Sequence, residues 1–150
     1  ADSKIDILPG GDNFKPAAGT YDVYFNPFLP AAYFMAAGAA APAVPETWGI
    51  VGTINGWGGD KLDWGLNLDA EGKYWVAKNV TLKADEEIKF RFKHDWTDNL
   101  GGEFAVDSAI SLTAGGANMK TTEGTFDIYL DVAASKAYIM TAGKTPADAN

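Results

Sequence analysis

The clearest alternation of apolar and polar residues lies in residues 88–93, which read Ile-Lys-Phe-Arg-Phe-Lys. Every second side chain is apolar, and a period of two is the signature of a β-strand with one buried and one exposed face. The pattern therefore predicts a strand that buries its apolar residues and exposes Lys89, Arg91 and Lys93.

Shorter runs of β-branched, aromatic and alternating residues follow one another along the rest of the chain, separated by turn residues such as Asn55-Gly56. No segment has the period and caps of an amphipathic helix. The expected strands are 48–54, 66–68, 74–77, 80–82, 88–93, 104–106, 110–112, 124–132 and 136–141. Many short strands at this spacing predict an all-β fold, an antiparallel immunoglobulin-like β-sandwich.

The chain also contains an internal repeat. A shift of 105 residues, the difference between Asp2 and Asp107, aligns two segments without a gap. The matched pairs include Ser3/Ser108, Ile5/Ile110, Gly10/Gly115, Gly11/Gly116, Asn13/Asn118, Lys15/Lys120, Gly19/Gly124, Thr20/Thr125, Asp22/Asp127, Tyr24/Tyr129, Tyr33/Tyr138, Met35/Met140 and Gly38/Gly143. Similar β-hairpin composition is the alternative explanation, but so long a match favours duplication of a domain of about 100 residues.

This repeat predicts two regions. Residues 1–43 correspond to the C-terminal part of a preceding repeat plus a linker, and residues 44–150 form the complete β-sandwich. A partial sandwich leaves sheet edges and an apolar face uncovered. We expect it to pack on the complete domain, to pair with another chain or to stay poorly ordered. Exchange between chains would give a domain-swapped dimer.

Composition removes several classes of function. The formal net charge is −8, which disfavours binding to the phosphate backbone of a nucleic acid. The absence of cysteine excludes disulfides, thiolate metal sites and cysteine nucleophiles. No apolar run is long enough to span a bilayer as a helix.

Catalytic and metal-binding patterns are weak. His94 is the only histidine, and no nucleophile-elbow motif accompanies it. The 20 acidic residues could supply a carboxylate pair for glycoside hydrolysis, but a small sandwich rarely forms the necessary cleft. No acidic spacing resembles an EF-hand. We therefore expect a protein that is not an enzyme and has no metal or cofactor.

Tryptophan usage indicates binding instead. Five tryptophans exceed what a core of this size usually needs. Trp57 and Trp96 lie in glycine-rich polar loops, 55–61 and 94–102, where few apolar side chains are available to bury an indole ring. Trp48, Trp64 and Trp75 lie in or near strands, and we expect them to contribute more to packing. The C–H faces of sugars stack on exposed indole rings, while sugar hydroxyls need polar partners.

Three segments resemble one family. They are 48–57 (WGIVGTINGW), 88–102 (IKFRFKHDWTDNLGG) and 115–128, which includes GGAN and GTFDI. These segments resemble the tandem domains of SusE/SusF-type outer-membrane starch-binding proteins. The resemblance implies immunoglobulin-like modules on a surface lipoprotein with an upstream lipid anchor. It also implies an outer-membrane location beside other glycan-utilisation surface proteins.

In such modules an aromatic pair and nearby polar side chains hold the α-glucan. By position, the residues implied here are Trp57, Trp96, Lys93, Asn99, Arg91, Asp98 and Lys61. Two positions depart from the family pattern: Ile54 replaces a phenylalanine-like residue, and His94 replaces a small or amide residue. The predicted function is non-catalytic binding of a starch-like polysaccharide. A structural spacer without its own ligand is the second hypothesis, and a small glycosidase is the third.

Overall fold

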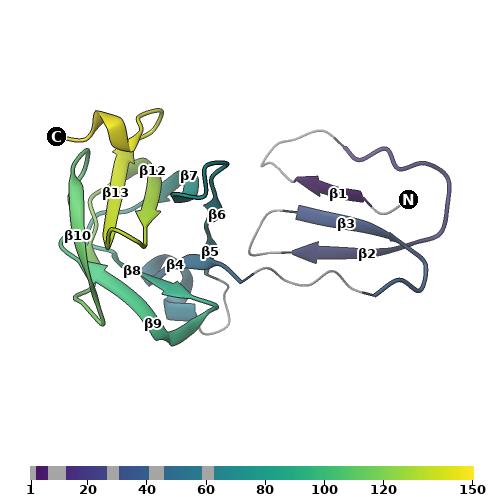
Figure 1. The fold of residues 1–150 in the computed structure, drawn as a ribbon, viewed down its shortest axis with the longest axis horizontal. Helices are drawn as coiled ribbons and strands as arrows, with labels where there is room; N and C mark the ends of the chain where they lie inside the picture. The colour runs from purple at the N-terminus through teal and green to yellow at the C-terminus, as the bar shows by residue number, and fades with distance from the viewer. Residues whose placement is uncertain (1–2, 7–12, 27–30, 41–45, 59–62) are drawn as a thin grey trace. The chain divides into compact units, whose positions relative to one another are not determined.

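The computed structural model describes residues 3–6, 13–26, 31–40, 46–58 and 63–150, which form strands and two short 3-10 helices (Figure 1). The chain divides into two compact units, Ala1–Pro45 and Glu46–Asn150. The elements are β1 Ser3–Asp6, β2 Tyr21–Asn26, β3 Ala31–Ala36, β4 Trp48–Gly52, η1 Thr53–Gly58, β5 Trp64–Gly65, β6 Asn67–Leu68, β7 Trp75–Leu82, β8 Glu87–Phe92, β9 Asp95–Gly102, β10 Ala109–Ala114, β11 Met119–Lys120, β12 Gly124–Asp131, β13 Lys136–Thr141 and η2 Pro146–Asp148.

The first unit contains a three-stranded antiparallel sheet in the order β1-β3-β2. The ring of Phe34, on the central strand, packs edge-on against the rings of Phe14 and Tyr21. The ring centroids are 5.9 and 6.2 Å apart, within the range of favourable aromatic pairs. This small apolar cluster lies on one face of the sheet.

The second unit repeats this pairing. Its strands β10, β13 and β12 take the places of β1, β3 and β2. Tyr21 pairs with Ala36, and Phe126 pairs with Thr141, 105 residues further along. All six residue pairs between β2 and β3 recur in this way between β12 and β13. The two segments therefore share strand order and register as well as sequence.

The turn that follows each hairpin is also repeated. The backbone N–H of Gly38 donates to Oδ2 of Asp22 at 2.8 Å, and that of Gly143 donates to Oδ2 of Asp127 at 3.0 Å. The φ angles of Gly38 and Gly143 are 83° and 91°, a region that glycine enters without steric cost. A glycine therefore follows the last strand in both units.

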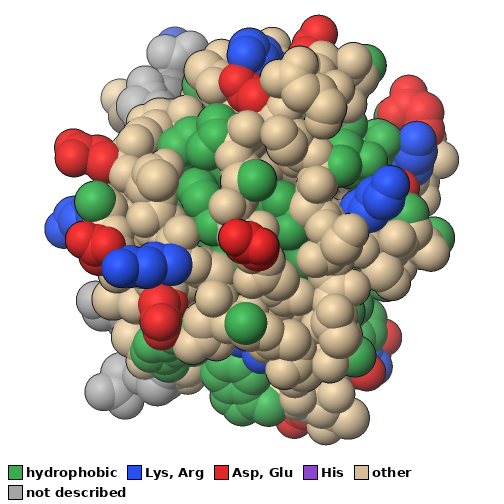
Figure 2. Space-filling view, turned by 90° about the vertical axis from the view of Figure 1, so that its left-hand side faces the viewer, with side chains coloured by type: hydrophobic (Ala, Val, Ile, Leu, Met, Phe, Trp, Pro, Cys, Tyr) green, Lys and Arg blue, Asp and Glu red, His purple; other side chains and the backbone are tan. Residues whose placement is uncertain are grey.

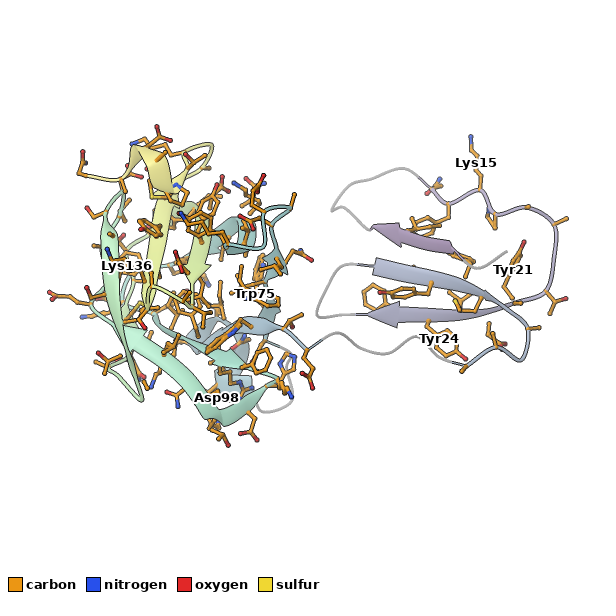
Figure 3. The ribbon with its side chains drawn as sticks, viewed as in Figure 1. Lys15, Tyr21, Tyr24, Trp75, Asp98 and Lys136 are labelled. Carbon is orange, nitrogen blue, oxygen red and sulfur yellow. The ribbon has the colours of Figure 1, made fainter. Side chains whose placement is uncertain are left out.

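A tyrosine fixes each turn from the neighbouring strand. The hydroxyl of Tyr24 donates to the carbonyl oxygen of Ala39 at 3.3 Å, and that of Tyr129 donates to the carbonyl oxygen of Lys144 at 3.1 Å. These are the same contact in two copies, because each residue is displaced from its counterpart by 105 positions. Tyr24 lies on β2 of the first unit (Figure 3).

The described strands of the second unit form a large, near-closed antiparallel sheet in the order β5-β4-β8-β9-β10-β13-β12-β7-β6, and β11 pairs with β8. Strand β10 joins its two halves, because residues 112–114 pair with β9 and residues 109–111 pair with β13. The prediction of a mostly antiparallel all-β fold is confirmed.

The core of the second unit lies between these two halves. Ile50 on β4 and Phe90 on β8 belong to the same buried cluster as Phe126, Ile128 and Leu130 on β12. The alternate positions on β12 point inward together, as the period of two requires. This packing fixes β4 and β8, which border the candidate site described below.

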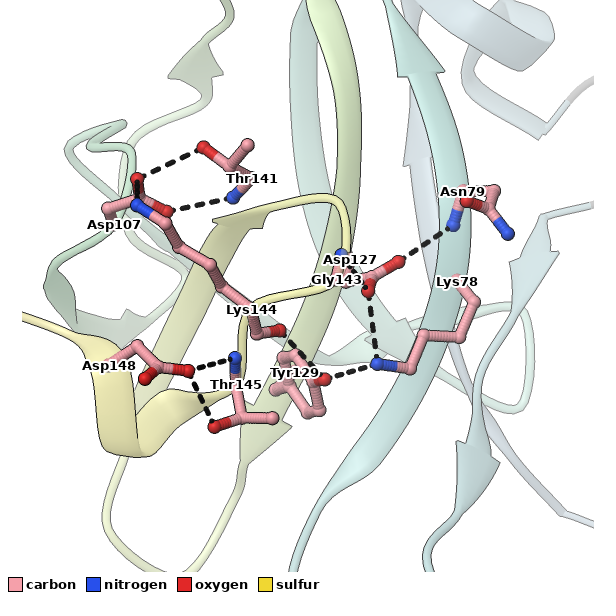
Figure 4. A network of polar contacts seen from close by, with 10 residues as sticks. All are labelled: Lys78, Asn79, Asp107, Asp127, Tyr129, Thr141, Gly143, Lys144, Thr145 and Asp148. Atoms are coloured by element: carbon pink, nitrogen blue, oxygen red, sulfur yellow. Dashed lines mark hydrogen bonds and ion pairs between the residues drawn. The ribbon is translucent and has the colours of Figure 1, made fainter.

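The opposite face of β12 carries a polar network (Figure 4). The ammonium group of Lys78, on β7, donates to Oδ2 of Asp127 at 3.1 Å and to the hydroxyl of Tyr129. The hydroxyl of Tyr129 in turn donates a hydrogen bond to the carbonyl oxygen of Lys144. These bonds tie β7, β12 and the segment after β13 together.

Asp127 is ionised more readily than an ordinary aspartate. Burial is the largest single influence on its pKa and acts to raise it. The hydrogen bonds from the backbone N–H groups of Gly143 and Asn79 and from Lys78 outweigh burial, so that the pKa lies below the ordinary value of 3.8. The carboxylate is thus held in its charged form by its donors.

Several expected elements differ from the structure. The strand expected at 48–54 ends at Gly52, where η1 follows, and the strands expected at 74–77 and 80–82 form the single strand β7. Residues 104–106 do not form a strand, and only Val106 makes an isolated parallel bridge, to Ile139. The loop expected at 94–102 contains strand β9. Its polar composition suggested a loop because most of its side chains remain outside the core, while its backbone pairs with β8 and β10.

Candidate functional site

Trp57 lies in η1, the short segment that follows β4. Its φ and ψ angles are 59° and 29°, in the left-handed region that a bulky residue rarely adopts. Such conformations are retained where the surrounding structure enforces them, and they concentrate at functional sites. Trp57 is half-buried, so one part of its indole ring contacts protein and another part is accessible.

Asn55 holds this segment in place. Its Oδ1 accepts a hydrogen bond from the N–H of Gly52 at 2.9 Å, and its Nδ2 donates to the carbonyl oxygen of Ile50 at 2.9 Å. Asn55 is buried, so these bonds satisfy a side chain that water does not reach. The chain turns at Asn55-Gly56 as predicted, with a backbone kink at these residues inside η1.

Trp96 is presented by an irregularity in strand pairing. The register between β8 and β9 passes from Phe92↔Asp95 to Arg91↔Asn99, so residues 96–98 are extra residues on β9. A bulge of this kind redirects side chains away from the regular ladder. The side chain of Trp96 is 45% exposed, as the sequence predicted for a tryptophan in this polar segment.

The two indole rings are neighbours. The ring centroids of Trp57 and Trp96 are 6.2 Å apart, and the planes are inclined by 33°. Residues almost 40 positions apart in sequence therefore form one aromatic surface. A pair of tilted, accessible rings can contact a curved chain of sugars more closely than a single ring can.

Arg91 supports this surface from below. Its guanidinium carbon lies 4.8 Å from the centroid of the Trp96 ring, a cation–π contact. The guanidinium group donates to both carboxylate oxygens of Asp63, from Nε at 2.6 Å and from Nη2 at 2.7 Å. Such a bidentate pair fixes the plane of the guanidinium group, and thereby the position of the ring above it.

Gly58 allows the Trp57 segment to approach this ion pair. A Cβ atom at Gly58 would lie 2.0 Å from Nη2 of Arg91, far inside contact distance. Only glycine fits here without displacing the arginine. His94 completes the arrangement, because its Nδ1 lies 3.0 Å from Oδ2 of Asp63.

The prediction that Lys89 and Arg91 face solvent was wrong. Arg91 is 5% exposed and Lys89 is 8% exposed, so both faces of β8 are covered. Arg91 can be buried because Asp63 neutralises it. Burial alone lowers the pKa of Lys89 from its ordinary value of 10.5.

The other predicted residues that the structure describes lie on β9 or directly after β8. Lys93 is exposed, and its ammonium nitrogen lies 2.5 Å from Oε1 of Glu46. Nδ2 of Asn99 donates to the carbonyl oxygen of Trp96 at 2.8 Å and so supports the bulge. Asp98 is exposed on β9 (Figure 3). Lys61 lies outside the described residues.

Sequence reasoning missed Asp63 and misjudged Trp64. Asp63 carries no motif, and its role depends on Arg91, 28 residues away. Trp64 is 43% exposed although it was expected to pack, because β5 is a two-residue strand at one end of the sheet order. Trp48 is buried and Trp75 is half-buried, in keeping with the prediction for both.

Other chemistry has little support in the described part of the chain. No group of three or more His, Cys, Asp or Glu side chains there could hold a metal ion. None of the helices described is both long enough and apolar enough to cross a membrane. No protein-family model matches the chain, and no curated protein matches it.

Proposed function

We propose that the second unit binds a polysaccharide, a starch-like α-glucan, on the surface formed by Trp57 and Trp96. The observation that carries the proposal is the pair of rings 6.2 Å apart, of which Trp96 is 45% exposed and is contacted by the guanidinium group of Arg91. Stacking on such rings requires no general acid or base, so the proposed function is binding without catalysis.

The buried ion pair explains how a shallow surface could be preorganised. Asp63 orients Arg91, Arg91 supports Trp96, and Gly58 lets the Trp57 segment lie close to the same guanidinium group. A ring that is already fixed loses less entropy when a ligand binds. Of the predicted polar side chains, Asp98 on β9 and Lys93 directly after β8 are exposed, and they are the proposed partners for sugar hydroxyls.

The affinity of one such site should be modest. Stacking contributes roughly 1–3 kcal/mol per ring, by analogy with nucleic-acid bases on aromatic platforms. Two rings with a few hydrogen bonds then correspond to a dissociation constant of about 0.1–1 mM. Several such modules on one polymer would bind more tightly through avidity.

Two further parts of the proposal rest on the sequence. The immunoglobulin-like form of the sandwich rests on the spacing of the short strands together with the resemblance, and a location at the outer-membrane surface beside other glycan-utilisation proteins rests on the resemblance alone. Nucleic acid is not a proposed partner. On the face drawn in Figure 2, acidic and basic side chains are interspersed around apolar ones, whereas a phosphate backbone is bound by concentrated positive charge.

Affinity electrophoresis tests the function. We expect amylopectin in the gel to retard the protein, and Trp96→Ala or Trp57→Ala to abolish the retardation. Trp64→Ala is the matched control, because Trp64 is 43% exposed but lies on β5. Unchanged migration of the unmodified protein across a panel of glucans would overturn the proposal, as would loss of retardation in the control alone.

A structural spacer is the second candidate. It is favoured by one observation: Arg91, Asn99 and Lys93 already have partners within the chain. This function predicts that Trp57→Ala and Trp96→Ala change stability but that no glucan retards any variant. Release of reducing sugar from starch would instead identify the third candidate, a glycosidase.

A further inference from the structure

The first unit exposes the side chains that its counterpart buries. Phe14, Val23 and Phe25 are 45%, 58% and 62% exposed. The residues 105 positions further along are Met119, Ile128 and Leu130, and all three are fully buried. The same strands in the same register thus present one apolar face to solvent in the first unit and to a core in the second.

The structure also identifies what covers this face in the second unit. Ile128 and Leu130 share a buried cluster with Ile50 of β4, Leu82 of β7 and Phe90 of β8. Met119 belongs to that cluster and pairs with Ile88 of β8. The covering side chains therefore come from the strands β4, β7 and β8.

The strand pairing at the edge of the sheet independently indicates that a strand equivalent to β7 is the missing neighbour of β2. Strand β12 pairs with β13 on one side and with β7 on the other. Its counterpart β2 pairs with β3, and in the described sheet β2 is an outer strand. The edge of β2 that corresponds to the β7 side of β12 is therefore an unfilled strand position in that sheet.

A third correspondence is polar. Lys78 of β7 donates to Asp127 and Tyr129 of β12. Asp22 and Tyr24 occupy the equivalent positions on β2 and keep the equivalent turn contacts. Strand β2 therefore retains the two side chains that, on β12, accept hydrogen bonds from the lysine of β7.

We propose that an apolar face of the first unit binds a set of strands equivalent to β4–β9. The face is formed by Ile5, Phe14, Val23, Phe25, Ala32 and Phe34. The bound strands would be connected to β1 in the way that β9 is connected to β10. The occupant places one strand beside β2, as β7 lies beside β12, and covers Val23 and Phe25 with apolar side chains. A second copy of the chain does not fit as well, because its own β4–β9 strands are already occupied by β10, β12 and β13.

The test is an extended protein in which residues 46–105 are duplicated directly ahead of Ala1, so that the 105-residue spacing is kept. Amide hydrogen exchange in β2 is compared with that of the unmodified chain. We expect the β2 amides that face away from β3 to exchange on the order of 100-fold more slowly in the extended protein, since they gain strand partners. No added protection would overturn the proposal.

Two substitutions test whether the added protection depends on burial of the proposed face or only on a more compact chain. Phe25→Asp should abolish the added protection in the extended protein, because its counterpart Leu130 is fully buried. Thr20→Asp is the matched control, because its counterpart Thr125 is exposed, and it should leave the protection intact. Equal effects of the two substitutions would contradict the proposed face.

Measurements on the unmodified chain distinguish the proposal from covering by a second copy or by the second unit of the same molecule. Its β2 amides should exchange rapidly, and sedimentation equilibrium should show no dimer that depends on Phe25. A dimer that Phe25→Asp dissociates would overturn the proposal in favour of a second copy. Protected β2 amides in a monomer would overturn it in favour of covering by residues 46–150 of the same molecule.

Discussion

Strands β1–β3 and strands β10, β12 and β13 have the same order, the same register and the same turn contacts, but only the second set has a buried core face. The comparison separates two causes of structure. Hydrogen bonds within the strands and the glycine turn determine the hairpin locally, whereas burial depends on strands that come from elsewhere in the sequence.

The comparison also locates the candidate function. Trp57, Asp63, Arg91 and Trp96 all lie within residues 46–102, and the described part of the first unit has no counterpart of that segment. The repeated strands are thus a scaffold, and the aromatic surface belongs to the strands that cover it. The part of the chain that the structure describes therefore contains one candidate binding surface of this kind.

The largest expected difference between the two units comes from truncating equivalent side chains. Leu130→Ala should lower the free energy of unfolding by about 2–5 kcal/mol, because it opens a cavity in a closed core. Phe25→Ala removes an exposed ring and should change it by about 0.5 kcal/mol or less. Urea denaturation of both variants measures the difference, and similar losses would contradict the comparison.

A smaller difference is expected for the equivalent tyrosines. Tyr129→Phe removes a hydroxyl that bonds both Lys78 and the carbonyl oxygen of Lys144, and should cost about 1–2 kcal/mol. Tyr24→Phe removes only the bond to Ala39 and should cost about 0.5 kcal/mol. The same denaturation experiment applies. A larger effect at Tyr24 would mean that β2 has partners like those of β12.

The smallest expected effect is a pH dependence. The pKa of Asp127 is lower in the folded protein than its ordinary value of 3.8, so its ionisation stabilises the fold above about pH 4. This contribution is lost as the pH falls through the folded pKa. Asp127→Asn should therefore be less stable than the unmodified protein at pH 6, and the gap should narrow by pH 2.5. A constant gap would contradict the role of the charge.

Local pattern predicted the repeated strands well. The expected strand at 136–141 coincides with β13, and the inward alternation of β12 follows from its sequence. Trp96 was predicted to be exposed because its neighbours are small or polar, and it is. Each of these features depends on residues within one or two strands, which is the range over which sequence pattern is informative.

The errors share a different cause. Arg91 was expected at the surface, but it is buried because Asp63, directly ahead of β5, provides a bidentate partner. Trp64 was expected to pack, but its two-residue strand lies at one end of the sheet order. Both outcomes depend on the order of the strands in space, which the period of the sequence does not encode.

The most direct test of the proposed binding surface follows the five indole N–H signals in an NMR titration with maltoheptaose. We predict that the signals of Trp57 and Trp96 shift together and saturate at one apparent dissociation constant of about 0.1–1 mM. The signals of Trp48, Trp64 and Trp75 should stay in place. Five unmoved signals, or a shift of Trp64 alone, would contradict the account.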